Sequence, residues 1–394
     1  MTSIRVSRKA ANRIASGHLW IFDSDVTARG EAQPGSAVRV TGPDGRLLGT
    51  AHYSSTSKIT LRLLSTRAEP IDPDFFRRRI AAAIGHRRAV VRDTDAYRVV
   101  FGEGDLLPGL IVDRYGDYLV AQFLSQGMES ARDAIVSCLL ETFAPRGILA
   151  RNDVPARRHE SLPLETAVLS GEIPDHVPLR MNGLNLSADL RHGQKTGGYL
   201  DQRENYLAAA CYAASAGGGP ALDCFTSNGG FALHLARVCE SVEAVDSSAP
   251  ALALARRNGS ANGISNVDFR QADVFETLAG HASARRRFSI VVLDPPAFAK
   301  SRRSLETAAG GYKDINLRAL RLLDPGGILV TCSCSHHLSE AAFLEIVAQA
   351  SLDAGRTLRV LERRTQAQDH PILLTVPETH YLKCLIFQVL DRIA

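Results

Sequence analysis

Two cysteines, two residues apart, lie in the segment LVTCSCSHHLS (329–339). Cys332 and Cys334 follow an apolar run. At this spacing they could be half of a metal site, disulfide partners, core residues, or a nucleophile with a neighbour. The chain has seven scattered cysteines, an odd number, and no Cys-x-x-Cys pair. We therefore expect no metal site and no disulfide framework, but reduced thiols in a cytoplasmic protein.

An Asp-Pro-Pro turn precedes these cysteines in the sequence, in LDPPAFAKS. Pro295 and Pro296 restrict the backbone φ angle and remove two hydrogen-bond donors, so Asp294 and nearby carbonyls can face a pocket from a rigid turn. A single carboxylate at a strand end is more often a helix cap. Four of them at successive strand ends favour a ligand that contains a nucleoside: Asp223, Asp246, Asp273 and Asp294.

Strand and helix patterns alternate in the region that holds all these residues, 179–394. Repeated strand–helix units with apolar strands predict a parallel, doubly wound sheet, in which ligands lie at the carboxyl ends of the strands. The turn LDCFTSNGGF follows the first strand, and its Gly229 and Gly230 let a ligand approach the backbone closely. It is not the G-x-G-x-x-G dinucleotide motif, so alone it is weak evidence.

Two further domains are predicted before this region, since 394 residues are too many for one compact core. Residues 1–68 hold short β-like runs and turn signals, and residues 72–178 hold an α+β pattern. Hydrophobic residues make up 45% and charged residues 22%, as in ordinary globular proteins. No run approaches the ~18 apolar residues of a membrane span, and no secretory signal pattern is present. A net charge of +4 permits a nucleic-acid partner without requiring one.

The order of these signals resembles the class I S-adenosylmethionine-dependent methyltransferases: a glycine turn, two acidic strand ends, then Asp-Pro-Pro. A thiolate can add to an electron-poor ring carbon. Addition at C6 of cytosine would let C5 attack a methyl sulfonium, and a cysteine one strand after Asp-Pro-Pro could face that base. The alternative for any cysteine is a place in the core. We expect that for Cys138, Cys211, Cys239 and Cys384, and expect Cys224 to pack away from the ligand.

Longer stretches resemble the bacterial family of RlmI-type 5-methylcytosine methyltransferases of large-subunit ribosomal RNA. The resemblance covers nearly the full length, and its most specific parts are GEGDLLPGLIVDRYGD and GQKTGGYLDQREN. The other matching stretches are GHLWIF, LDCFTSNGGF, LDPPAFAKS, SCS and PETHYLK.

That resemblance implies a PUA domain at residues 1–68, a small central domain at 72–178 and a Rossmann-like methyltransferase domain at 179–394. It also implies S-adenosyl-L-methionine as cofactor, S-adenosyl-L-homocysteine as product, and a homodimer. Cys334 in SCS would be the nucleophile, while TCS at 331–333 resembles another group of RNA cytosine methyltransferases and favours Cys332. The implied cofactor-binding residues are Lys195, Thr196, Gly197, Tyr199, Asp201, Gln202, Asp223, Phe225, Gly229, Gly230, Asp246 (ribose), Ser247, Asp273 and Val274 (adenine), and Asp294, which also lies at the reaction site.

Basic residues are the candidate RNA contacts, although a pair of arginines is more often a solvated face. The cluster KSRRS is favoured because it follows the Asp-Pro-Pro turn directly. Weaker candidates are the pair Arg87 and Arg88 and the segment ARRH (156–159). The predicted RNA-binding residues are Arg8, Lys9, Lys300, Arg302 and Arg303.

Two other functions stay open on the sequence. The same fold could methylate a purine nitrogen without a covalent step, and both cysteines would then be core residues. Alternatively, the chain could be a ribosomal-RNA-binding assembly factor that has lost its chemistry. The sequence does not say which nucleotide would be modified, nor whether the substrate would be naked RNA or an assembled subunit.

Overall fold

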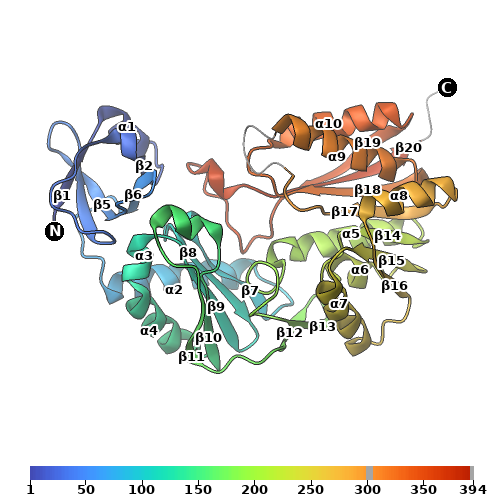
Figure 1. The fold of residues 1–394 in the computed structure, drawn as a ribbon, viewed down its shortest axis with the longest axis horizontal. Helices are drawn as coiled ribbons and strands as arrows, with labels where there is room; N and C mark the ends of the chain where they lie inside the picture. Colours follow the sequence, from blue (N-terminus) through green and yellow to red (C-terminus); the bar gives the residue numbers. More distant parts are fainter. Residues whose placement is uncertain (299–304, 391–394) are drawn as a thin grey trace. The chain divides into compact units, whose positions relative to one another are not determined.

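The computed structural model describes residues 1–298 and 305–390 (Figure 1). The chain forms two compact units. The first consists of Met1–Arg180, Ala188–Gly197 and Gln368–Thr379, and the second of Met181–Ser187, Gly198–Ala367 and His380–Ala394. In the described residues, no helix has both the length and the apolar character needed to cross a membrane.

A six-stranded sheet and one helix make up the N-terminal part of the first unit, with strand order β2-β6-β5-β4-β1-β3. Side chains such as Ile21, Val38 and Leu61 alternate inward and are buried. The hydroxyl of Ser7 caps the helix by accepting from the amide of Ala10. The elements are β1 (Ser3–Val6), α1 (Arg8–Ala15), β2 (Trp20–Phe22), η1 (Asp23–Asp25), β3 (Val26–Ala28), β4 (Ala37–Thr41), β5 (Leu47–Tyr53) and β6 (Ile59–Ser65).

A second sheet of the first unit has five strands in the order β11-β10-β9-β8-β7. The long helix α2 begins after Asp72, whose carboxylate accepts from the amide of Phe75, with Pro73 at its first position. The elements are α2 (Pro73–Val90), β7 (Ala96–Phe101), η2 (Gly102–Asp105), β8 (Leu110–Tyr115), β9 (Tyr118–Phe123), α3 (Gln126–Ser130), α4 (Arg132–Phe143), β10 (Gly147–Arg151), η3 (Pro155–Glu160) and β11 (Thr166–Gly171). A separate two-stranded sheet is formed by β12 (Val177–Met181) and β13 (Leu184–Ala188).

The second unit is built on a seven-stranded sheet in the order β16-β15-β14-β17-β18-β20-β19. The strands from β16 to β18 pair in parallel, as predicted, but β20 is antiparallel to both of its neighbours. The elements are η4 (Leu200–Gln202), α5 (Arg203–Ser215), β14 (Ala221–Cys224), α6 (Gly230–Leu235), β15 (Val242–Asp246), α7 (Ala249–Ala261), β16 (Val267–Gln271), α8 (Val274–Ser283), β17 (Phe288–Leu293), α9 (Leu305–Leu320), β18 (Leu323–Ser333), α10 (Glu340–Asp353), β19 (Thr357–Arg364), η6 (Pro377–Thr379, in the first unit) and β20 (Lys383–Leu390).

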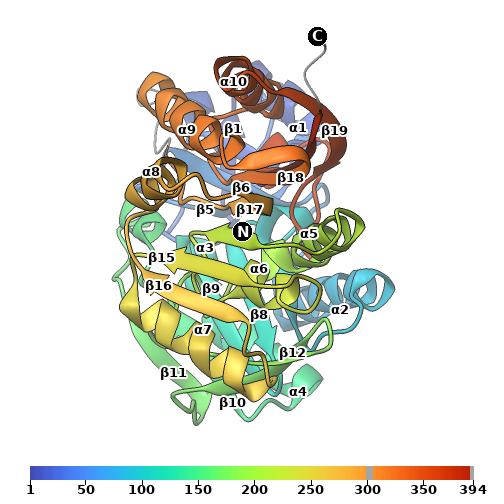
Figure 2. The ribbon, with the colours of Figure 1, turned by 90° about the vertical axis from the view of Figure 1, so that its right-hand side faces the viewer.

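Helices cover both faces of this sheet, with α8, α9 and α10 on one side and α5, α6 and α7 on the other (Figure 2). One core cluster joins α8, α9 and α10 to the sheet through side chains such as Val291, Leu329 and Tyr312. The strand order places β14 beside both β15 and β17, where the direction of winding reverses. Doubly wound sheets bind ligands at that point.

Candidate active site

The turn after β14 has an unusual backbone. Phe225 and Ser227 are not glycines, yet their φ angles are 65° and 50°, and Gly229 follows at 88°. Such left-handed residues cost free energy and persist where the surrounding structure holds them. At Gly230 an added Cβ would lie 2.4 Å from the ring of Tyr206, so only glycine fits there. The turn at the switch point of the sheet therefore has a strained backbone. Its two glycines make room for Leu233, Ala255 and Tyr206, so the expectation that they admit a ligand is not confirmed.

Asp223 stabilises this turn through hydrogen bonds. Its side chain is fully buried, and one carboxylate oxygen accepts from the Thr226 hydroxyl (2.6 Å) and from the Ala232 amide (2.9 Å). Burial raises the pKa of Asp223 to about 7, although the Thr226 hydrogen bond opposes the shift. The described contacts of this predicted cofactor residue thus lie within the turn and the first turn of α6.

Asp246 ends β15 and is only half-buried. One carboxylate oxygen accepts from the Ser227 amide (2.9 Å) and the other from the Ser248 amide (2.8 Å). Each oxygen keeps lone pairs for a second donor. The carboxylate therefore fixes the strained turn and can still accept hydrogen bonds from a diol such as a ribose. The neighbouring side chain of Ser247 is exposed.

Asp273 takes the helix-cap role that was the alternative for each of these aspartates. It is the N-cap of α8, and its carboxylate accepts from the Glu276 amide at 3.0 Å. The next side chain, Val274, is buried in the core between α8 and the sheet. Any contact of Val274 with a ligand would therefore involve its backbone.

The segment that enters α5 is anchored by a residue of PETHYLK. The Tyr381 hydroxyl donates to the carboxylate of buried Asp201 at 2.6 Å. The Gln202 side chain accepts from Asn205 at 2.6 Å. The carbonyl of Tyr199 accepts from the Tyr206 hydroxyl at 3.3 Å.

The other part of GQKTGGYLDQREN belongs to the first unit. There the Thr196 hydroxyl donates to Asp113 (2.6 Å) and bonds with the Tyr115 hydroxyl (2.9 Å), so this predicted cofactor residue uses its side chain internally. Gly197 has φ +138°, and an added Cβ would lie 2.6 Å from a side-chain carbon of Leu190. Lys195 is exposed.

Predicted site residues from four parts of the sequence gather round Tyr199. Burial raises the pKa of its phenol most, and the charges of Asp294, Asp201, Cys334 and Asp246 raise it further, in that order. These charges act on one hydroxyl because the ends of β15, β17 and β18 meet at one edge of the sheet. Asp294 follows β17 directly and is half-buried. The structure thus brings together the two acidic strand ends, the Asp201 segment and the second cysteine of the pair.

The two cysteines have different environments. Cys332 is fully buried opposite Cys384 of β20, and burial and then the contact with Cys384 raise its thiol pKa well above the ordinary range. In a strand, side chains two residues apart point to the same face, which would put both thiols together. Cys334 does not follow this rule because β18 ends at Ser333. Cys334 is half-buried and not fully enclosed. A ligand at this edge of the sheet can therefore approach Cys334, whereas Cys332 lies in the core.

Tyr312 of α9 holds the segment on both sides of Cys334. Its oxygen accepts from the Ser333 hydroxyl (2.9 Å) and its hydroxyl bonds with Ser335 (3.0 Å). The Ser335 amide donates back to the Ser333 hydroxyl (3.3 Å). All three side chains are buried. On β20, Lys383 donates to the carbonyl of Ser335 at 2.7 Å.

Sequence reasoning missed Tyr312 and gave no role to Lys383 or Tyr381. Tyr312 lies within a helical pattern with nothing to mark it. The other two were visible only as members of the PETHYLK stretch. That stretch reaches the site because β20 inserts beside β18, a pairing of distant segments that no local pattern predicts.

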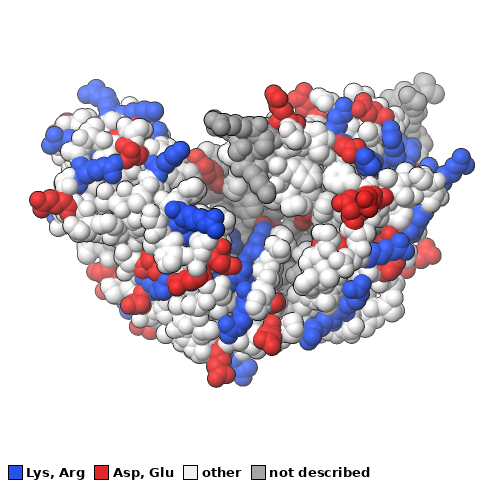
Figure 3. Space-filling view, in the orientation of Figure 1, with Lys and Arg blue, Asp and Glu red and all other residues white. Residues whose placement is uncertain are grey.

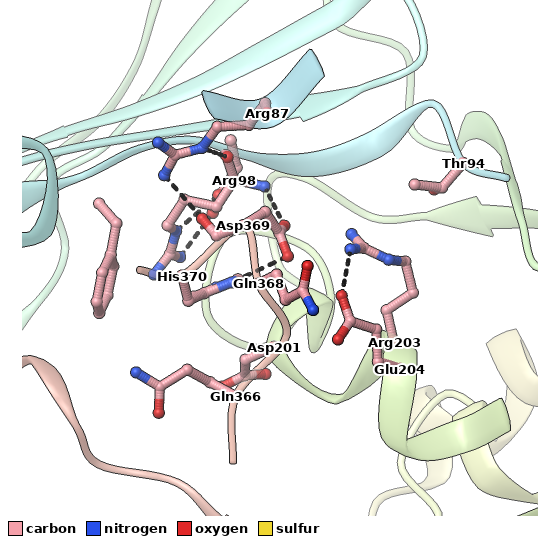
Figure 4. Close-up of polar contacts among 12 residues, drawn as sticks. Arg87, Thr94, Arg98, Asp201, Arg203, Glu204, Gln366, Gln368, Asp369 and His370 are labelled. Carbon is pink, nitrogen blue, oxygen red and sulfur yellow. Dashed lines mark hydrogen bonds and ion pairs between the residues drawn. The ribbon is translucent and has the colours of Figure 1, made fainter. Parts of the chain in front are cut away.

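Some basic candidates for RNA contact are wrong. Arg87 is buried and pairs with Asp105. It also donates to the carbonyl of Asp369, whose carboxylate accepts from the Arg98 amide (Figure 4). Arg157 is fully buried and pairs with Glu129 at 2.8 Å. Both arginines therefore stabilise the first unit and are not available for phosphate.

Other basic candidates are compatible with a nucleic-acid contact. Arg8 and Lys9 are exposed on α1, and Lys and Arg side chains gather over that part of the surface (Figure 3). Lys300, Arg302 and Arg303 lie outside the described residues.

The remaining cysteines follow the prediction with one exception. Cys138, Cys239, Cys384 and Cys224 are buried, and Cys224 packs in the core between β14 and α8. Cys211 is exposed on α5, so its assignment to the core is wrong. Alanines lie on both sides of Cys211 in the sequence of α5, so the sequence pattern does not show that this position faces outward. Among the described residues no three potential ligands of the types His, Cys, Asp or Glu are grouped to hold a metal ion.

Solved structures and domain models agree with the observed fold. A putative methyltransferase complexed with SAH is similar with a TM-score of 0.85, and a putative SAM-dependent methyltransferase from Streptococcus mutans with 0.83. Each is 21% identical, with 99% of this chain and 100% of that chain covered. A PUA-like domain model matches residues 4–66 and a methyltransferase domain model matches residues 216–373. The predicted fold class is confirmed: a PUA-like N-terminal domain and a C-terminal methyltransferase domain of mixed α/β structure.

Relatives over the full length define the family. A ribosomal RNA large subunit methyltransferase I from Shewanella amazonensis is 42% identical, covering 98% of this chain and all of the relative. A protein of the same name from Tolumonas auensis is 39% identical over 99% of this chain and 100% of its own length. The chain belongs to the family of ribosomal RNA large subunit methyltransferase I proteins, and the resemblance seen in the sequence is confirmed.

Proposed function

We propose that this protein transfers a methyl group from S-adenosyl-L-methionine to C5 of a cytosine in large-subunit ribosomal RNA, with Cys334 as the nucleophile. The relatives that share its full length are named for methylation of that RNA. The observation that carries the cytosine chemistry is the half-buried thiol of Cys334 beside Asp294 and Tyr199, at the ligand-binding edge of the sheet.

The residues of the β14 and β15 ends fit the proposed methyl donor. Asp246 offers carboxylate lone pairs to the ribose hydroxyls. Tyr199 and Asp201 would line the same pocket. When bound, the donor supplies an electrophilic methyl group on a sulfonium, and S-adenosyl-L-homocysteine is the product.

Covalent catalysis follows from the chemistry of cytosine. C5 is a weak nucleophile, and addition of the Cys334 thiolate at C6 gives it the electron density to accept a methyl group. Asp294 protonates or holds the N3 edge of the base: as a carboxylic acid it donates its proton to N3, which offsets the negative charge that develops in the ring. Loss of the C5 proton to a base then expels the thiolate and restores the aromatic ring.

The deciding test uses a ribosomal RNA fragment that contains 5-fluorocytosine, because fluorine at C5 blocks the final elimination. With the methyl donor present, the wild-type protein should form a covalent adduct that is resolved by denaturing electrophoresis. Cys334→Ala should abolish the adduct and Cys332→Ala should retain it. An adduct that survives in Cys334→Ala and disappears in Cys332→Ala would reverse the assignment of the nucleophile.

Two outcomes would point to the other functions. If both alanine variants keep full turnover and no adduct forms, the protein acts on a purine nitrogen without a covalent step. If calorimetry detects no binding of S-adenosyl-L-methionine, the protein is a ribosomal-RNA-binding assembly factor. Mapping of methylated positions in ribosomal RNA from a deletion strain would identify the nucleotide.

We also propose that Arg8 and Lys9 contact the RNA backbone, that Lys300, Arg302 and Arg303 do the same near the base, and that the protein acts in the cytoplasm. Phosphate contacts release counterions, so each lost contact should lower the slope of log K against log salt by about 0.7 to 0.9. The homodimer and the domain limits 1–68, 72–178 and 179–394 remain predictions.

A further inference from the structure

We propose that Lys383 of β20 takes the proton of Cys334 and holds the resulting thiolate, as the base that activates the nucleophile. The inference deepens the proposed function and rests on it, since it assigns the group that activates the thiol. It begins from a buried lysine, which is rarely found without a specific partner.

The strand pairing places Lys383 beside the cysteine. In the antiparallel register of β18 and β20, Lys383 is directly opposite Ser333, the residue before Cys334. Paired residues in antiparallel strands put their side chains on the same face of the sheet. Lys383 is 3% exposed, and its Nζ donates at 2.7 Å to the carbonyl of Ser335, the residue after Cys334. Lys383 is therefore paired through its backbone with the residue before Cys334, and its amine is hydrogen-bonded to the residue after it.

The hydrogen bonds of Lys383 suit a group that gains and loses a proton. Its two acceptors are neutral carbonyl oxygens, those of Ser335 and Tyr381, each at 2.7 Å. A neutral amine has two N–H groups, which these carbonyls satisfy, and one lone pair that can accept a proton. The ammonium form has a third N–H, which can donate to a thiolate. Both protonation states are thus compatible with the same position of Nζ.

The electrostatic surroundings agree with this exchange. Burial lowers the pKa of Lys383 to about 8, and the charges of Cys334 and of Glu340 on α10 act in the opposite direction. Glu340 is already paired with Arg363 of β19. Lys383 in turn lowers the pKa of His336, after the larger effect of burial. A lysine whose pKa lies close to neutral pH can act as a base towards a neighbouring thiol at physiological pH.

Groups on other elements face the thiol as well. Tyr199 and Tyr312 both have phenol pKa values that are raised mainly by burial and further by the charge of Cys334. Both phenols therefore stay protonated and neutral near pH 7. Asp294 cannot supply a positive charge to a thiolate in either protonation state. His336 can also accept a proton, but burial and the charge of Lys383 lower its pKa and so disfavour its cationic form. Of these groups, Lys383 is therefore the one best able both to remove the proton and to supply a positive charge.

The step is balanced as a proton transfer. The S–H bond of Cys334 breaks, the proton goes to the Lys383 lone pair, and the electron pair stays on sulfur. The thiolate then forms the bond to C6 of the base. When the C5 proton has left, the C6–S bond breaks, sulfur takes its electrons back as thiolate, and the ammonium of Lys383 stabilises it. No oxidant or reductant takes part.

The test measures thiol ionisation without RNA or methyl donor. Wild-type protein is alkylated with iodoacetamide across a series of pH values, and mass spectrometry follows the Cys334 and Cys211 peptides separately. Cys211 is exposed and serves as the internal reference. The midpoint for Cys334 should lie at least one pH unit below that of Cys211. A midpoint equal to or above that of Cys211 would overturn the proposal, and this result needs no variant.

Two variants distinguish charge from packing. Lys383→Met should move the Cys334 midpoint up by at least one unit, which is about a tenfold loss of thiolate at pH 7, and should leave Cys211 unchanged. Lys383→Arg keeps the positive charge and should keep the low midpoint. Equal upward shifts in both variants would mean that Lys383 acts only through packing, and an unchanged profile in Lys383→Met would refute its role.

The proposed function can fail separately from this inference. If the fluorocytosine adduct does not form but the Cys334 profile depends on Lys383, the cytosine chemistry is wrong and the thiol–amine pair stands. If the adduct forms at Cys334 and the pH profile of Cys334 alkylation is the same with and without Lys383, the cytosine chemistry stands and the proposed role of Lys383 is wrong.

Discussion

The substitution Tyr312→Phe tests whether the segment around Cys334 must be held in place. It removes one oxygen from a buried ring of hydrogen bonds that Tyr312 forms with Ser333 and Ser335. The phenyl ring keeps its packing against Phe343, at 5.3 Å between centroids. The change therefore isolates the hydroxyl.

Its cost can be worked from the contacts. The hydrogen bonds to Ser333 and Ser335 disappear, each with a net contribution of about 1 kcal/mol, and the buried Ser335 hydroxyl loses a partner. The Ser333 oxygen still accepts from the Ser335 amide, so it is not left without a hydrogen bond. We expect the free energy of unfolding of the second unit to fall by about 2 to 3 kcal/mol. A displaced Cys334 should also lower kcat by roughly 10- to 100-fold while the affinity for the methyl donor stays unchanged.

The two units can be followed separately in urea. Cys332 is buried, so its pulsed alkylation reports opening of the second unit. Trp20 is the one tryptophan of the chain and reports on the first unit by fluorescence. Tyr312→Phe should lower the urea midpoint for Cys332 and leave that for Trp20 unchanged. Tyr53→Phe removes the hydroxyl of a buried tyrosine in the first unit, which accepts from Arg29, and should do the reverse. If Tyr312→Phe leaves both the Cys332 midpoint and kcat as in wild type, the hydroxyl ring does not hold the nucleophile.

Three further substitutions test buried contacts in the two units. Asp223→Asn should gain stability relative to wild type at pH 8 but not at pH 4 in thermal unfolding. Burial raises the pKa of Asp223 to about 7, so the wild type binds an extra proton in the folded state and loses stability as pH rises from about 4 to 7. Gly230→Ala should abolish donor binding in calorimetry, because its Cβ would lie 2.4 Å from Tyr206. Arg98→Met should destabilise the first unit by about 3 to 5 kcal/mol in urea, measured by fluorescence, because it leaves the carboxylate of Asp113 buried without its cation.

Each of these results has an outcome that would contradict it. A parallel pH profile for Asp223→Asn and wild type would mean that the carboxyl titrates normally. Normal donor affinity in Gly230→Ala would show that the turn tolerates a shift. A loss below about 1 kcal/mol in Arg98→Met would mean that the hydroxyl of Thr196, which also donates to Asp113, compensates for the lost cation.

Local patterns in the sequence were enough to predict the class of fold. Apolar strands that alternate with amphipathic helices leave few arrangements other than a doubly wound sheet, because each strand must be covered on both faces. The same reasoning placed Asp246 and Asp294 at strand ends. It failed where a long-range contact overrides the local pattern: Arg87 and Arg157 look like surface charges in sequence but are buried by partners far along the chain.

The sequence by itself determined which residue types were available: two cysteines after an apolar strand, four aspartates at strand ends and a rigid Asp-Pro-Pro turn. Only the tertiary structure distinguished the two thiols. β18 ends between them, so Cys332 is buried against Cys384 while Cys334 is half-buried at the edge of the sheet. The pairing of β18 with β20 also brings Lys383 next to that segment. Side-chain environment depends on which distant strands pair, and the spacing of residues along one strand does not contain that information.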